Sequence, residues 1–188
     1  MTEHEDQHSF VECSTFADDI KYHGGAWQSD YHFYQGAWIE EGSPSDYDLP
    51  NKTRNLTVGI TNLVAWLGQK DGDAYLDSYI YDYIQNRLYP GDEGNAQSYA
   101  LRLLIHYIGD IVQPFHGEDR FDKEFVDGDK GANLFPLKYH YNVDELHALW
   151  DQVLYTERNF ISRVSNHSSH ISKSMWCCSI EMFCYLKK

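Results

Sequence analysis

The spacing of hydrophobic residues along the chain predicts a mostly helical protein. Residues 56–67 carry leucine, isoleucine and valine at intervals of three and four, which is typical of an amphipathic helix. Similar spacing predicts a short helix within residues 10–22 and a weaker one at residues 76–84. Residues 96–112 are hydrophobic on nearly every side, so we expect this helix to be central and buried. A further helix is expected at residues 143–158.

The segments between these helices lack a helical period. Residues 27–38 are aromatic and rich in turn-forming residues, residues 117–131 read as a charged loop, and residues 133–139 are expected to be extended. After about residue 160 the chain turns to serine, histidine, lysine and cysteine without periodic hydrophobic positions. We therefore predict an all-α fold, with one helical domain over residues 1–160 and an unassigned tail over residues 161–188.

The composition limits the classes of function. Hydrophobic residues make up 42% of the 188 residues, which is enough to bury the core of one domain. The formal net charge of −14 argues against a protein that grips polyanions with a basic surface, so metal ions would have to supply the positive charge at any phosphate site. No hydrophobic run is long enough to span a membrane, and the first residues do not form an export signal.

The cysteines and the glycosylation sequons leave several readings open. The four cysteines allow three pairings, and a small disulfide loop near the C-terminus is one of them. These cysteines are Cys13, Cys177, Cys178 and Cys184. Sequons begin at Asn51, Asn55 and Asn166, and they matter only in an exported protein.

Two histidine–aspartate pairs carry the most specific chemistry in the sequence. His106 with Asp110, and His147 with Asp151, stand four residues apart, which places each imidazole beside a carboxylate on one helix face. Either pair alone is also explained as a core histidine that donates to a carboxylate. Together with His116, however, they supply three imidazoles and two carboxylates, a donor mix that zinc prefers. The sequence therefore predicts a zinc site.

Asp18 and His32 are two further candidate ligands. Asp18 lies near the end of the first predicted helix, and His32 stands among aromatic residues. Taken singly, a helix-end acid and a partly buried histidine explain these two residues better than a metal site does.

The order of these motifs along the chain resembles that of the zinc-dependent single-strand-specific nucleases, the nuclease S-one/P-one family. It is similar, more distantly, to zinc phospholipase C. The resemblance covers about residues 10–158. The matching motifs are Phe16-Ala17-Asp18-Asp19; Tyr31-His32-Phe33; His106, Asp110, Pro114 and His116; Gly131-Ala132-Asn133; and Glu145-Leu146-His147 with Trp150-Asp151.

The resemblance implies a helical bundle of the phospholipase C and nuclease P-one type that holds clustered zinc ions. One zinc would be held by Asp18, His32, His106 and Asp110, and a second by His116, His147 and Asp151. A third zinc in the family uses an N-terminal tryptophan, which this sequence lacks, so we expect two. The missing tryptophan indicates either a fragment of a longer gene product or a lost third site.

The resemblance also implies roles in metal-assisted phosphodiester hydrolysis. Asp18 would orient or deprotonate the attacking water, and Asn133 would donate a hydrogen bond to the phosphate. Substrate contacts are expected from Asn133, Tyr31, Phe33 and Gln35, with Phe135 as a further aromatic candidate. Core packing is the alternative role for at least two of the three aromatic rings. Gln35 stands where the family usually has an aspartate that reads the base edge, so the base preference is open.

The expected function is hydrolysis of single-stranded DNA or RNA to 5′-phosphate products, together with 3′-nucleotidase activity. Two alternatives remain: a phospholipase C-like zinc phosphodiesterase, and a degenerate non-catalytic fragment without the third zinc site. The resemblance implies a monomer that is secreted or delivered to a lysosome or vacuole.

Overall fold

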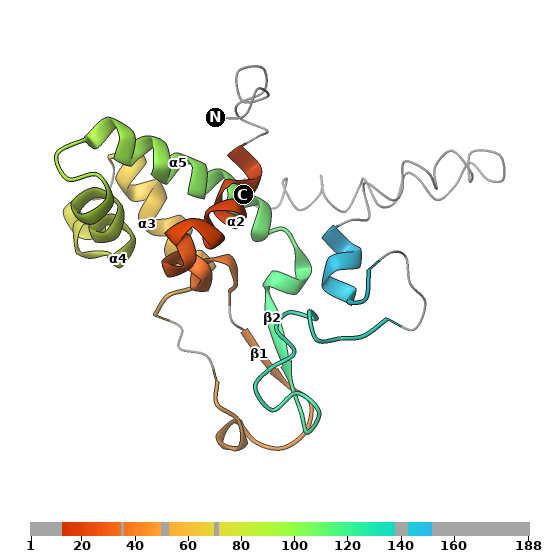
Figure 1. The fold of residues 1–188 in the computed structure, drawn as a ribbon. Coiled ribbons are helices and arrows are strands. Elements are labelled where there is room, and N and C mark those ends of the chain that lie inside the picture. The colour runs from red at the N-terminus through yellow and green to blue at the C-terminus, as the bar shows by residue number, and fades with distance from the viewer. Residues whose placement is uncertain (1–12, 35, 50–52, 70–71, 138–142, 152–188) are drawn as a thin grey trace, which may run out of the picture. The chain divides into compact units, whose positions relative to one another are not determined.

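The computed structural model describes residues 13–34, 36–49, 53–69, 72–137 and 143–151 (Figure 1). The chain forms two compact units, which divide after Gly131. The predicted boundary at residue 160 and the tail of residues 161–188 lie outside the described residues.

The first unit is built mainly of helices, which confirms the predicted all-α class. In the labels used here, α marks an α-helix and η marks a 3-10 or π turn. The helices and turns are η1 (Cys13–Thr15), α2 (Phe16–Ile20), η2 (Lys21–Gly25), η3 (Ala26–His32), η4 (Pro44–Asp46), α3 (Leu56–Gly68), η5 (Gly72–Asp77), α4 (Tyr79–Tyr81), η6 (Asp82–Leu88), α5 (Glu93–Asp110) and η7 (Pro114–His116).

The core of this unit lies between α3 and α5, which run beside each other (Figure 1). Leu63 and Trp66 from α3 and Ala100 and Leu103 from α5 are among its buried residues. Both helices begin at a side-chain cap, because Asn55 accepts from the backbone N–H of Val58, and an aspartate caps α5 in the same way. The predicted helices at residues 56–67 and 96–112 are therefore confirmed to within three residues.

Asn55 also starts one of the predicted sequons. Its side chain is buried and its Oδ1 accepts from Val58 at 2.9 Å, so this amide is already engaged in the folded chain. Sequons at Asn51 and Asn166 lie outside the described residues. The only described cysteine, Cys13, has a free thiol.

The helix predicted at residues 96–112 was expected to be central and buried, but only one face of α5 is buried. Leu101 and Ile108 on α5 are 49% and 41% exposed, whereas His106, Tyr107 and Asp110 on the other face are buried. The hydrophobic spacing along the sequence does not show which hydrophobic side chains pack against another element and which remain exposed. The buried face of α5 is the one that carries the candidate ligands.

A two-stranded parallel sheet was not predicted. Strand β1 (Gly36–Ile39) pairs with β2 (Glu118–Phe121), with Gly36 opposite Glu118 and Ile39 opposite Phe121. Each strand has only four residues, which is too short to show a clear alternation of hydrophobic and polar positions in the sequence. The two strands are also far apart in the chain, so no hairpin turn indicates their pairing. The sheet ties the chain after His32 to the chain after His116.

Gly131 lies at the end of the loop that follows β2, packed against η7. Its φ of +61° is left-handed, and an added Cβ would overlap the backbone oxygen of Phe115. We expect Gly131→Ala to lower the free energy of unfolding by at least about 1–2 kcal/mol, from the left-handed backbone alone. Gly94→Ala in the first turn of α5 is the control, since its Cβ meets only one atom at 3.9 Å and alanine favours a helix.

Urea unfolding of the two variants beside the wild type checks this prediction. A Gly131→Ala protein as stable as the wild type would show that the loop does not require this backbone conformation.

The second unit is described over residues 132–137 and 143–151. Pro136 forms an antiparallel bridge with Glu145, and residues 146–151 are helical. The predicted extended segment is thus reduced to this bridge within the described residues, and the predicted helix begins three residues later than expected. None of the helices in the described part of the chain is both long and apolar enough to cross a membrane.

Candidate metal centre

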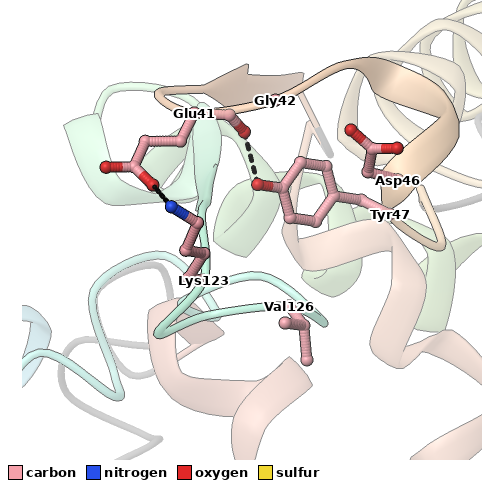
Figure 2. Close-up of a pocket in the computed structure, with 6 residues that line it drawn as sticks. All are labelled: Glu41, Gly42, Asp46, Tyr47, Lys123 and Val126. Carbon is pink, nitrogen blue, oxygen red and sulfur yellow. Dashed lines mark hydrogen bonds and ion pairs between the residues drawn. The ribbon is translucent and has the colours of Figure 1, made fainter.

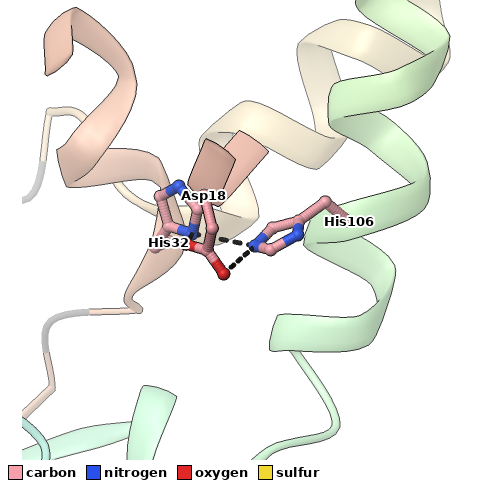
Figure 3. Close-up of side chains that lie close together, drawn as sticks. All are labelled: Asp18, His32 and His106. Atoms are coloured by element: carbon pink, nitrogen blue, oxygen red, sulfur yellow. Dashed lines mark hydrogen bonds and ion pairs between the residues drawn. The ribbon is translucent and has the colours of Figure 1, made fainter. Parts of the chain in front are cut away.

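Three segments of the first unit bring Asp18, His32 and His106 together. Asp18 comes from α2, His32 ends η3, and His106 lies on the buried face of α5. One possible ligand atom from each lies within 4.8 Å of the others, and Figure 3 shows the three side chains facing one another. These residues are a group that could hold a metal ion.

Asp110 completes this group from the next turn of α5. Its Oδ2 lies 2.9 Å from Nδ1 of His32 and 3.2 Å from Nε2 of His106. The two ring nitrogens are 3.1 Å apart, and the Asp18 oxygens lie 3.6 Å from His106 and 3.7 Å from His32. An aspartate that simply accepts from one core histidine does not explain why four side chains converge on one point.

Four of these five distances fit the coordination shell of zinc, and the 3.7 Å between Asp18 and His32 is just outside it. Ligand atoms about 2.0–2.2 Å from zinc are separated from one another by roughly 2.8–3.6 Å, for angles between 90° and the tetrahedral value. Two imidazoles and two carboxylates also supply a donor set that zinc accepts. The residues present therefore fit a zinc ion.

Backbone carbonyl groups orient two of the histidines. Nδ1 of His106 donates to the carbonyl oxygen of Ser14 at 2.5 Å, and Nδ1 of His116 donates to that of His32 at 2.6 Å. A carbonyl only accepts, so each Nδ1 carries a proton, and in the neutral form of each ring Nε2 has the lone pair that a metal needs. The Ser14 and His32 carbonyls give no sequence signal, because any residue can supply them.

Burial and charge act together on the buried ligands. Burial lowers the pKa of His32, which favours the neutral imidazole. Burial acts in the same direction on His106, but the contacts with Asp110, Asp18 and the Ser14 carbonyl together outweigh it and raise the pKa of His106. Burial alone would raise the pKa of Asp110, yet the close imidazoles of His106 and His32 lower it to about 2, so this carboxylate is anionic at neutral pH.

Asp18 differs from the other ligands by its exposure. Its side chain is 57% exposed, and Nζ of Lys21 binds Oδ1 at 2.7 Å. Burial acts to raise its pKa, but the hydrogen bond from Lys21 and the nearby His106 lower it. Asp18 is therefore the member of the group that is open to solvent. Lys21 was not predicted from the sequence, although its position three residues after Asp18 on a helix is compatible with this ion pair.

His116 stands next to this group. Its Nδ1 is 3.6 Å from Oδ1 of Asp110, so the two oxygens of Asp110 face different histidines. The ring of Phe33 stacks on the imidazole of His116, with 4.6 Å between centroids and 19° between planes. Phe33, a predicted substrate contact, is thus at the edge of the candidate metal centre.

Two predicted ligands and one predicted catalytic residue belong to the second unit. Nε2 of His147 lies 3.4 Å from Oδ2 of Asp151, one helical turn along residues 146–151. Asn133 lies near the start of the same unit, and Phe135, 37% exposed, follows it. The predicted second zinc shell, which joins these ligands to His116, and the contact of Asn133 with the phosphate stay predictions.

Of the remaining predicted substrate contacts, Tyr31 lies in the core. Tyr31 is only 2% exposed and packs against Tyr107 and the backbone of Gly59 in the core, so it offers no ring face to a base. Core packing, the alternative role for these rings, therefore describes Tyr31. Gln35 lies outside the described residues.

A separate pocket of about 430 Å³ lies at the far ends of the two strands (Figure 2). Its lining is Glu41, Gly42, Asp46, Tyr47, Lys123 and Val126. Lys123 is already paired with Glu41 at 2.9 Å, so the pocket leaves no free positive charge for a phosphate. The two parallel strands, each roughly 13 Å long, begin shortly after His32 and His116 and end beside the pocket.

Comparison with known proteins identifies the chain's relatives. Residues 1–176 match the family described as S1/P1 Nuclease. Nuclease P1 from Penicillium citrinum and Nuclease PA3 from a Penicillium species are each 26% identical over 140 residues, which is 73% of this chain and 42% of each relative. The chain therefore spans less than half the length of these two proteins. No solved structure matches.

Proposed function

Because this chain belongs to the S1/P1 nuclease family, we propose that it hydrolyses phosphodiester bonds of single-stranded DNA or RNA to 5′-phosphate products. We include 3′-nucleotidase activity in this proposal. The observation that carries it is the convergence of Asp18, His32, His106 and Asp110 in a group that fits zinc.

In this proposal these four side chains hold one zinc, and His116, His147 and Asp151 hold a second. Zinc would supply a Lewis acid that neutralises phosphate charge and makes a water acidic enough to lose its proton near neutral pH. The net charge of −14 supports a role for metal ions in phosphate binding, because acidic side chains outnumber lysine and arginine in this chain.

The protein groups would position the reactants. Asp18 is the exposed member of the metal centre and is fixed by Lys21 at Oδ1, so we assign it to orient the attacking water and accept its proton. Asn133 would donate its amide N–H to a phosphate oxygen as negative charge develops there.

Unpaired bases would be held by stacking and amide contacts. Phe33 beside His116 is the best-placed ring for a base, with Phe135 as a second, and Gln35 would bond a base edge. A base in a duplex is not free to stack in this way, which is why we propose a preference for single strands. We also propose that the protein works after secretion or in a lysosome or vacuole.

Digestion assays with purified, zinc-loaded protein test the proposed activity. We expect release of nucleotides with 5′-phosphates from single-stranded DNA, slower cleavage of a duplex of the same sequence, and loss of both activities on chelation. Hydrolysis of phosphatidylcholine without cleavage of DNA would favour the phospholipase C alternative. Zinc-loaded protein that cleaves neither would contradict the proposed activity and favour a non-catalytic fragment.

A further inference from the structure

A buried glutamine connects the three segments that carry Asp18, His32 and His106. Nε2 of Gln28 donates to the carbonyl oxygen of Ala17 at 2.7 Å, and Oε1 of Gln28 accepts from the hydroxyl of Tyr107 at 2.7 Å. Ala17, Gln28 and Tyr107 have no exposed surface. We call these three residues the Gln28 network.

Each member of the Gln28 network stands close to a candidate ligand in the chain. Ala17 precedes Asp18, Tyr107 follows His106, and Gln28 lies one turn before His32 on η3. The ring of Tyr107 also packs edge-on against the imidazole of His32, with 5.4 Å between centroids.

Burial makes these two hydrogen bonds difficult to exchange. Movement of α2, η3 or α5 relative to the others would leave an amide or a hydroxyl buried without a partner. Burial also raises the pKa of Tyr107 well above its ordinary value, so its hydroxyl stays protonated and can donate.

The ligand group needs this kind of support. The nitrogen atoms of His32 and His106, 3.1 Å apart, share Oδ2 of Asp110 as a neighbour and face the carboxylate of Asp18. Contacts of the two imidazoles with Asp110 hold part of this group together without a cation, but they do not fix the backbone segments that carry the four side chains. The surrounding protein must set the spacing of these segments.

We propose that Gln28 is a positioning residue of the metal centre, which holds the segments of Asp18, His32 and His106 in register through Ala17 and Tyr107. This inference rests on the proposed function, because it assumes that the group binds zinc. A glutamine that only stabilised the core would affect folding without a specific effect on the metal.

Zinc affinity measured by competition with a chromophoric chelator tests the proposal, with the visible spectrum of the cobalt(II)-substituted protein as a report on ligand geometry. Gln28→Met keeps the length of the side chain and removes both hydrogen bonds. Tyr107→Phe keeps the ring and removes one. We expect Gln28→Met to weaken zinc binding by about tenfold or more, with a changed cobalt spectrum, and Tyr107→Phe to have a smaller effect in the same direction.

Ile84→Ala is the matched control, because Ile84 is fully buried in the same core but lies on η6, outside the Gln28 network. It should lose stability and keep its zinc affinity within about twofold. If Gln28→Met does not fold, Tyr107→Phe decides the question.

The outcomes separate the two proposals. If the wild type binds no zinc, the proposed metal centre is wrong and this inference is wrong with it. If the wild type binds zinc but the Gln28 and Tyr107 variants bind it equally tightly, or Ile84→Ala weakens binding to the same extent, the inference alone is overturned.

Discussion

Asp110→Asn is expected to lower the rate of single-stranded DNA hydrolysis by at least about a hundredfold, the scale on which removal of one transition-state contact acts. The carboxylate contacts His32 and His106 through Oδ2 and lies 3.6 Å from His116 through Oδ1. Asparagine has nearly the same shape, so the substitution removes the negative charge and one metal-binding oxygen with little change in packing. The measurement is the initial rate of digestion at saturating zinc.

Asp92→Asn is the matched control for this prediction. It makes the same chemical change at the N-cap of the same helix, where asparagine caps as well as aspartate does, and it should leave the rate unchanged. Asn133→Ala should lose less activity than Asp110→Asn, because it removes one hydrogen-bond donor and no ligand. Equal and mild losses in Asp110→Asn and Asp92→Asn would contradict the role given to Asp110.

Removal of zinc is expected to lower the melting temperature by roughly 10 °C. Zinc at about a thousand times its dissociation constant stabilises the folded state by about 4 kcal/mol, and each kcal/mol moves the melting temperature of a chain this size by about 2–4 °C. The physical reason is that two imidazoles and two carboxylates lie close together in the folded chain, and without zinc no cation binds their lone pairs. Calorimetry with and without a chelator measures the difference.

Two histidine variants make this prediction specific. His106→Ala removes a ligand and should abolish most of the zinc-dependent shift. His23→Ala removes an exposed histidine on η2, outside the metal centre, and should keep the full shift. A melting temperature that does not respond to the chelator, or responds equally in His106→Ala, would show that the group does not bind zinc.

The sequence predicted well those parts of the fold that local rules decide. Helix α3 follows from its hydrophobic spacing, and its observed end at Gly68 is one residue beyond the predicted end. The neighbouring segment of residues 76–84 shows only weak spacing. It contains the end of the 3-10 helix η5 and then a continuous helical stretch, in which the α-helix α4 passes into the π-helix η6.

Features that depend on distant partners were not predictable in this way. Strands β1 and β2 are too short to show alternating hydrophobic and polar positions. They pair across a long stretch of sequence, after the segments that end at His32 and His116. The exposed face of α5 looks like a core face in sequence, because Leu101 and Ile108 have the spacing of buried residues.

The candidate metal centre shows the same division. The spacing of His106 and Asp110 predicts their contact directly, since four residues are one helical turn. Asp18 and His32 entered the prediction only through resemblance to a family, and the structure brings them to the same point. Gln28 gave no signal, because a buried glutamine cannot be distinguished from an exposed one in a short irregular helix.

The central claim is that Asp18, His32, His106 and Asp110 hold a zinc ion, and anomalous diffraction tests it most directly. Data from a crystal of the zinc-loaded protein, collected on both sides of the zinc absorption edge, locate the metal independently of its chemistry. We predict an anomalous peak enclosed by these four side chains, with ligand distances of about 2.0–2.2 Å. No peak at this place, or peaks only at exposed histidines such as His23, would contradict the claim.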